Sequence, residues 1–180
     1  MRRVLVTGGA GFIGSHFIRI LLAEEADAQV VNLDVLTYAG NLANLADVAS
    51  SPRYRFVRGD IRDMKVAQEL AADADWIVNF AAESHVDRST KARAGEFIDP
   101  NVYGAYVMLE ATRQVNRGAR FLQVGTDEVY GDVPFPEFPN EQAMLAPSSP
   151  YSAAKAGADH IALAFHRTHQ MDVIVSRCTN

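Results

Sequence analysis

Tyr151 and Lys155 lie four residues apart at the start of a predicted helix. Ser149 and Pro150 before them are typical of an N-cap and a first helical position, and the spacing places both side chains on one helix face. A phenol keeps its proton to a pH of about 10, and a neighbouring ammonium stabilises the phenolate, so the pair can provide a base at neutral pH. Taken alone, this spacing more often marks an exposed helical pair.

Thr126, Asp127 and Glu128 follow a predicted strand, where the active-site loops of open parallel sheets converge. Two adjacent carboxylates beside a hydroxyl can supply a general acid and a general base, if their surroundings move their pKa values apart. In an extended segment the two carboxylates would point in different directions. Shared chemistry therefore requires a turn that directs both toward one substrate, and the alternative is an ordinary polar turn.

The first predicted strand runs into a glycine cluster that contains Gly8, Gly11 and Gly14. These glycines would permit a tight turn, a close approach to a pyrophosphate and the packing of a helix whose N-terminus favours the anion. Asp34 follows about 20 residues later, at the end of the second apolar strand. A carboxylate there accepts hydrogen bonds from ribose and repels a 2′-phosphate, which predicts NAD rather than NADP. Without the glycines, Asp34 would be a helix cap or a turn residue.

Asp60, His85 and Cys178 are further polar or reactive residues near predicted strand ends. Asp60 can accept a hydrogen bond from the adenine amine or cap the next helix. His85 can contact the cofactor or sugar, or belong to a charged loop, and Cys178 is expected to be a buried apolar residue. The other histidines show no metal-ligand spacing, so no metal site is predicted; they are His16, His160, His166 and His169.

Short apolar runs alternate with helical patterns along the whole chain. Predicted strands cover residues 4–6, 30–33, 54–57, 76–80, 121–124 and 173–175, and predicted helices cover 14–25, 63–71, 103–115 and 152–168. Most of the strands are apolar without alternation, as in strands buried on both faces. The pattern predicts an α/β fold, a Rossmann-like doubly wound parallel sheet, with residues 1–180 forming one NAD-binding domain that carries the catalytic residues.

Composition limits the possible functions of the chain. Its 180 residues are 48% hydrophobic and 22% charged, which suffices for one domain with a core. A net charge of −5 has the wrong sign for a protein that binds nucleic-acid or membrane phosphates. A single cysteine excludes an internal disulfide and favours the cytoplasm, and the N-terminal apolar run is too short for a signal peptide or a membrane span.

Five segments together resemble the extended short-chain dehydrogenase/reductases: residues 7–15, 32–42, 81–89, 126–131 and 151–155. The glycine loop and Tyr-x-x-x-Lys are common to that superfamily. The segments Leu-Thr-Tyr-Ala-Gly-Asn, Glu-Ser-His-Val-Asp-Arg-Ser and Thr-Asp-Glu-Val-Tyr-Gly are more specific, and they are similar to those of the nucleotide-sugar 4,6-dehydratases. The resemblance covers essentially the whole chain.

This resemblance implies NAD-dependent dehydration of dTDP-glucose to dTDP-4-keto-6-deoxyglucose, in deoxysugar biosynthesis. Tyr151, assisted by Lys155 and Thr126, would take the proton of the sugar 4-hydroxyl while hydride passes from carbon 4 to NAD. Glu128 would remove the proton on carbon 5 as Asp127 protonates the departing 6-hydroxyl, and NADH would return its hydride to carbon 6. Elimination at adjacent carbons needs a base and an acid, which gives the paired carboxylates a purpose.

The resemblance also implies binding residues and an assembly. Residues implied to contact NAD are Gly8, Gly11, Phe12, Ile13, Gly14, Asp34, Thr37, Asp60, Ile61, Ala81, Tyr151 and Lys155. Residues implied to contact the nucleotide sugar are Ser84, Thr126 and Asn180, and Arg88 is a further candidate near a phosphate. A homodimer is implied through the predicted helices 103–115 and 152–168.

The sequence departs from the family pattern at two places. Pro100 stands where the family carries a threonine that contacts the cofactor. The chain ends at Asn180, where the family continues into a C-terminal substrate domain, so we expect that domain to be missing here. Two alternatives remain open: a related NAD-dependent epimerase or decarboxylase, which needs no acid for a leaving 6-hydroxyl, and a non-catalytic NAD-binding module.

Overall fold

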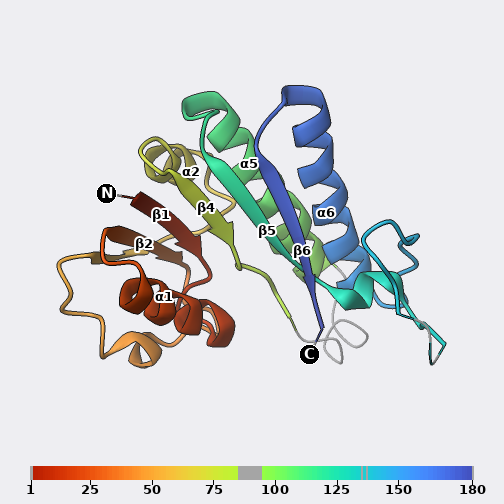
Figure 1. The fold of residues 1–180 in the computed structure, drawn as a ribbon, viewed down its shortest axis with the longest axis horizontal. Coiled ribbons are helices and arrows are strands. Elements are labelled where there is room, and N and C mark those ends of the chain that lie inside the picture. Colours follow the sequence, from red (N-terminus) through yellow and green to blue (C-terminus); the bar gives the residue numbers. More distant parts are fainter. Residues whose placement is uncertain (1, 85–94, 135, 137, 180) are drawn as a thin grey trace.

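The computed structural model describes residues 2–84, 95–134, 136 and 138–179. Within them, strands form one sheet in which all neighbours are parallel, in the order β3-β2-β1-β4-β5-β6 (Figure 1). The strands are β1 (Arg2–Thr7), β2 (Ala28–Asp34), β3 (Tyr54–Arg58), β4 (Trp76–Asn79), β5 (Arg120–Thr126) and β6 (Val173–Cys178). The strand order reverses between β1 and β4, and ligands of open α/β sheets bind at such a switch point. All predicted strands and the doubly wound fold are confirmed.

Helices cover both faces of this sheet. They are α1 (Phe12–Glu24), α2 (Met64–Ala71), α4 (Gly95–Ile98), α5 (Gly104–Val115) and α6 (Pro150–His169), with 3₁₀ helices η1 (Leu42–Leu45) and η3 (Asp127–Tyr130) and a π-helical turn η2 (Asp99–Tyr103). Two helices begin with residues that are typical N-caps. The Asp63 carboxylate accepts the N–H groups of Lys65 and Val66 at the start of α2, and Ser149 forms a capping box with Ser152 at the start of α6.

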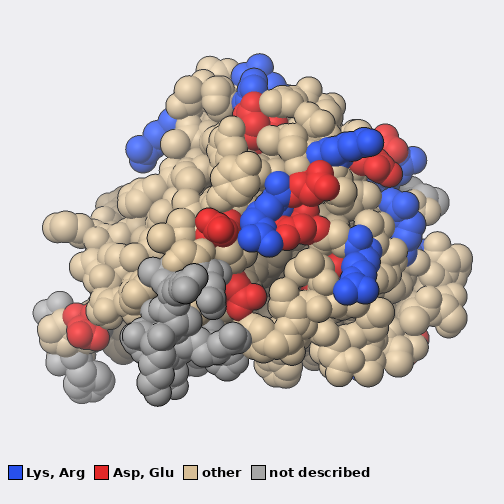
Figure 2. Space-filling model, turned by 180° about the vertical axis from the view of Figure 1, so that it is seen from behind, with Lys and Arg blue, Asp and Glu red and all other residues tan. Residues whose placement is uncertain are grey.

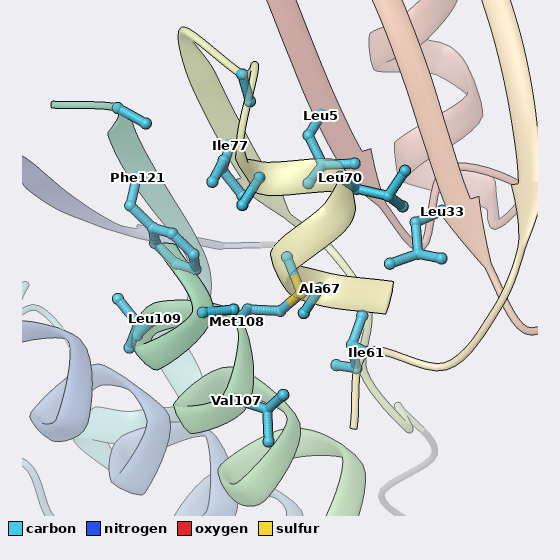
Figure 3. Packing of buried hydrophobic residues seen from close by; sticks show 14 of the residues in the cluster. Leu5, Leu33, Ile61, Ala67, Leu70, Ile77, Val107, Met108, Leu109 and Phe121 are labelled. Carbon is cyan, nitrogen blue, oxygen red and sulfur yellow. The ribbon is translucent and has the colours of Figure 1, made fainter. Parts of the chain in front are cut away.

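Two apolar clusters bind these helices to the sheet. One lies between the sheet and α2, α5 and α6, and Figure 3 shows Met108 and Leu109 of α5 close to Phe121 of β5. The other packs Ile18 and Leu22 of α1 against the opposite face. Because side chains alternate along a strand, β1 contributes to both clusters. The sheet is therefore buried on both faces.

The N-terminal part of the predicted helix 103–115 differs from the expectation. A π-helical turn precedes it and contains Pro100, and the N–H of Gly104 donates to the carbonyl oxygen of Asp99, five residues earlier. Proline has no N–H to donate within a helix, which is consistent with a local departure from α-helical bonding.

The surface carries both charge signs side by side. On the face seen in Figure 2, Lys and Arg side chains lie next to Asp and Glu side chains. Exposed ion pairs such as Arg120–Asp172, at 2.6 Å, show the same local pairing. None of the described helices is long and apolar enough to cross a membrane.

Candidate functional site

A cavity of about 1180 Å³ opens at the carboxyl edge of the sheet. Its walls come from the β1–α1 loop, the ends of β2, β3 and β4, the η2 segment, β5, the start of α6 and the end of β6. This is the place where the topology predicts a ligand site. Within the described residues no group of His, Cys, Asp and Glu is arranged to hold a metal ion.

Most of the residues implied for binding and catalysis line this one cavity. They are Gly8, Gly11, Phe12, Ile13, Gly14, Asp34, Thr37, Asp60, Ile61, Ala81, Ser84, Thr126, Glu128, Tyr151 and Lys155. The proposed nucleotide end and the proposed catalytic end, distant in sequence, are therefore parts of one continuous space. His85, Arg88 and Asn180 lie outside the described residues.

The glycine loop has a geometry that only glycine fits. Gly8 has a φ of +68°, and a Cβ there would lie 2.7 Å from the backbone nitrogen of Ala81. A Cβ at Gly14 would overlap the carbonyl oxygen of Gly8. Gly11 is the N-cap of α1 and no side chain caps that helix, so its first N–H groups are available to an anion.

Asp34 joins the end of β2 to this loop. Its carboxylate is 9% exposed and accepts the N–H of Ala10 at 3.0 Å and the N–H of Leu36 at 2.8 Å, one on each oxygen. Each carboxylate oxygen can accept more than one hydrogen bond, so both remain able to accept ribose hydroxyls. The carboxylate is thus fixed at the cavity wall by backbone contacts.

Asp60 has a strong partner that the sequence analysis did not anticipate. The Arg62 guanidinium donates to both of its carboxylate oxygens, at 2.6 to 3.0 Å, and lowers the pKa of Asp60. Arg62 also lines the cavity. An adenine amine would therefore share the Asp60 oxygens with Arg62, and the planar Arg62 group adds a positive charge at this end of the site.

Tyr151 and Lys155 are buried, 9% and 5% exposed, on the first turns of α6. The Lys155 ammonium donates to the carbonyl oxygen of Val124 at 2.6 Å. Burial raises the pKa of Tyr151 to about 12, and the negative charges of Glu128 and Tyr38 act in the same direction. This shift is opposite to the lowering expected from the Tyr–Lys pair, because desolvation of the phenolate dominates in the chain alone.

The carboxylates of Asp127 and Glu128 point in different directions from η3. The Thr126 hydroxyl accepts the N–H of Glu128 at 3.3 Å and caps η3. With about three residues per turn, consecutive side chains of a 3₁₀ helix point in well-separated directions. Glu128 lines the cavity, and burial followed by the charge of Asp127 raises the pKa of Glu128. The Asp127 carboxylate accepts a hydrogen bond from the Thr126 hydroxyl at 3.4 Å, and Thr126 lines the cavity, so Asp127 lies next to it.

Several cavity residues were not found by sequence reasoning. Tyr38, Arg62, Phe97 and Cys178 line the cavity, and Pro100 does so as well. Cys178 is exposed rather than buried, which corrects the expectation, because it is the last residue of the edge strand β6. The pairing of Arg62 with Asp60 could have been predicted from the segment Asp60-Ile61-Arg62, since a carboxylate and a guanidinium two residues apart can pair across a turn.

Comparisons with known proteins match nearly the whole chain to one family. The family model described as GDP-mannose 4,6 dehydratase matches residues 5–180. The dTDP-glucose 4,6-dehydratase of Streptomyces niveus is 50% identical over 182 residues, covering 99% of this chain and 53% of the relative. The crystal structure of DesIV, a dTDP-glucose 4,6-dehydratase of Streptomyces venezuelae with NAD bound, has a TM-score of 0.93 at 50% identity and covers 98% of this chain and 55% of DesIV.

A more distant enzyme has the same fold. The structure of UDP-glucuronic acid 4-epimerase from Bacillus cereus, with UDP-glucuronic acid and NAD, has a TM-score of 0.87 at 26% identity and covers 97% of this chain and 55% of the epimerase. The chain spans about half the length of the curated relatives it matches. The family match extends over nearly every residue and includes the glycine loop and the Tyr-x-x-x-Lys segment, so the chain belongs to the GDP-mannose 4,6 dehydratase family.

Proposed function

We propose that this chain binds NAD and supplies the catalytic residues for dehydration of dTDP-glucose to dTDP-4-keto-6-deoxyglucose. One observation carries the proposal: a single cavity is lined by the glycine loop and Asp34 at one end and by Thr126, Glu128, Tyr151 and Lys155 at the other. The names of the relatives at about 50% identity support the same reaction. Residues 1–180 would then form the NAD-binding and catalytic domain.

The residues present fit NAD. The glycine loop leaves a cradle that a Cβ would fill, the uncapped N-terminus of α1 suits a pyrophosphate, and the fixed Asp34 carboxylate suits ribose hydroxyls. Phe12 and Ile13 are exposed in the first turn of α1 at this cavity. When bound, NAD supplies the acceptor and later the donor of hydride.

At the catalytic end Tyr151 would take the proton of the sugar 4-hydroxyl. A phenol whose pKa is about 12 in the chain alone needs nearby positive charge to act as a base at neutral pH. Lys155 provides one such charge from the same helix face, held toward the sheet by Val124. Thr126 lines the same cavity, and its hydroxyl can hydrogen-bond the sugar oxygen.

Glu128 would remove the proton on carbon 5 once carbon 4 is a ketone. Its pKa is raised by burial and by Asp127, which makes the carboxylate a stronger base than an exposed one. Asp127 would protonate the departing 6-hydroxyl. Asp127 accepts a hydrogen bond from the Thr126 hydroxyl, and Thr126 lines the cavity, so the Asp127 carboxylate lies next to the proposed sugar site.

We also propose a cytoplasmic homodimer that uses α5 and α6. Exposed Tyr103 and Tyr106 lie with ring centroids 5.9 Å apart, and Tyr106 contacts Phe165 of α6 edge-on at 6.3 Å. An aromatic surface shared by two adjacent helices suits the packing of two further helices against it. Sedimentation of the purified chain tests the dimer.

The test of the function is to incubate the chain with NAD and dTDP-glucose and to analyse the sugar nucleotide by mass spectrometry. We expect a product lighter by one water. Unchanged dTDP-glucose, with NAD bound to the chain, would overturn the catalytic proposal and favour the non-catalytic NAD module.

Epimerisation or decarboxylation of a nucleotide sugar is a second candidate, and one observation favours it. Neither reaction needs an acid for a leaving 6-hydroxyl, and a UDP-glucuronic acid 4-epimerase has the same fold over 97% of this chain. Asp127→Asn separates the two candidates. Dehydration predicts a large fall in turnover for this variant, whereas turnover of an epimerase or decarboxylase substrate would be unchanged.

A further inference from the structure

Asp159 is a buried acid that the mechanism above does not use. It lies on α6 one turn beyond Lys155, a spacing that places the two side chains on one helix face, and it is 0% exposed. One carboxylate oxygen, Oδ2, accepts a hydrogen bond from Nε of Arg177 at 2.9 Å. The other, Oδ1, has no hydrogen-bond donor among the described residues. A buried carboxylate that is only half satisfied is costly, so its position needs a reason.

The end of β5 is shaped around this carboxylate. A Cβ at Gly125 would lie 3.0 Å from Oδ1 of Asp159 and would also overlap the carbonyl oxygen of Ser176. The neighbouring Val124 accepts the hydrogen bond of the Lys155 ammonium, and Thr126 caps η3. Three consecutive residues of β5 thus face Lys155, Asp159 and the catalytic carboxylate segment, and only glycine at position 125 leaves room for Asp159.

Titratable groups on α6, β6 and η3 lie in the region of Lys155. The charges of Asp159, on α6, and of Cys178, on β6, both act on Lys155. Arg177 of β6 pairs with Asp159, and the charge of Glu128, on η3, acts on Tyr151, four residues before Lys155 on α6. Burial lowers the pKa of Lys155 and raises the pKa of Asp159, and the charge of each group opposes the shift of the other. Buried lysines that lack such a carboxylate can lose their charge near neutral pH.

We propose that Asp159 is a positioning residue that keeps the Lys155 ammonium charged and directed at the end of β5. Arg177 of β6 holds Asp159, and Arg177 is itself held by η3, because it donates to the Tyr130 hydroxyl at 3.0 Å. The use of this charge in catalysis rests on the proposed function, but its maintenance by Asp159 does not.

The test follows the Lys155 side-chain amine by NMR titration in the chain without NAD or sugar. In the wild-type chain we expect Lys155 to be protonated at neutral pH. The variant Asp159→Asn keeps the shape of the side chain. In this variant we expect the titration midpoint of the Lys155 amine to fall by about 1 pH unit or more. Asp47→Asn is the matched control, because Asp47 pairs with Arg19 in an exposed ion pair outside the cavity, and it should leave Lys155 unchanged.

A merely structural role of Asp159 predicts the opposite shift. Loosened packing would expose Lys155 and raise its titration toward that of an exposed lysine. An unchanged or raised Lys155 titration in Asp159→Asn would therefore overturn the proposal. If that variant does not fold, the wild-type titration still decides, since a neutral Lys155 at neutral pH would overturn it as well. Neither measurement depends on turnover, so failure to dehydrate dTDP-glucose would leave this inference standing.

Discussion

The carboxylate of Asp34, at the end of β2, accepts a hydrogen bond from the backbone N–H of Ala10, which lies in the glycine loop that follows the neighbouring parallel strand β1. Its second oxygen accepts the N–H of Leu36. The residue proposed to contact ribose is therefore also the residue that holds the phosphate loop in place. Nucleotide recognition and loop geometry depend on the same side chain.

Replacement of this side chain should weaken NAD binding. Asp34→Ala removes hydrogen bonds of a charged acceptor, each worth about 1.5–3 kcal/mol, so the Kd for NAD should rise by about tenfold to a hundredfold. Isothermal titration calorimetry measures this. The exposed Asp47→Ala variant is the control and should bind NAD normally. An unaltered Kd in Asp34→Ala would remove Asp34 from the nucleotide site.

The glycine loop gives a second prediction, on stability. Gly8→Ala forces a Cβ to within 2.7 Å of the Ala81 backbone at a φ of +68°, so it should lower the melting temperature and abolish NAD binding. Gly118→Ala is matched in chemistry, but its added Cβ would meet only Asn116, at 3.9 Å. Thermal unfolding followed by circular dichroism compares the two. Equal melting temperatures would show that the loop is not the tight turn described.

Removal of the proposed carbon-5 base should separate the two halves of the reaction. Glu128→Gln keeps the shape of the side chain but cannot accept the proton, so water loss should stop while hydride transfer to NAD continues in part. NADH absorbance reports the first step, and mass spectrometry of the sugar reports the second. Unaltered product formation in this variant would take Glu128 out of the mechanism.

Tyr151 provides a prediction on pH dependence. Burial raises its pKa to about 12, so in the chain alone the phenol should stay protonated well above the ordinary value of about 10. Bound NAD places a positively charged ring in the site and should lower this titration, since positive charge favours the phenolate. Ultraviolet difference titration, with Tyr151→Phe as the reference, measures both states. A Tyr151 that titrates at or below its ordinary value without NAD would contradict the burial described.

Much of the fold follows from local sequence signals. The β-branched runs identified all the strands, and Ser149-Pro150 identified the start of α6, because these signals act through neighbouring residues alone. The π-helical turn at Pro100 and the exposure of Cys178 were not predicted, since they depend on bonding and coverage by distant elements.

Only part of the candidate site has a local signal in the sequence. The glycine spacing and Asp34 indicated the nucleotide end, and the cavity contains both. The directions of Asp127 and Glu128 depend on a 3₁₀ turn that nothing local specified. Arg62 was overlooked although its partner Asp60 is two residues away, whereas the partner of Asp159, Arg177, lies on another element, β6, and is not evident from the sequence.

The most direct test of the proposed reaction uses dTDP-glucose deuterated at carbon 4. Incubation with this chain and NAD should give a dehydrated product that keeps the deuterium, now at carbon 6, because NAD would accept the hydride from carbon 4 and return it within the same site. Nuclear magnetic resonance and mass spectrometry of the product locate the label. Unreacted substrate, or a dehydrated product from which the deuterium has been lost to solvent, would contradict this account.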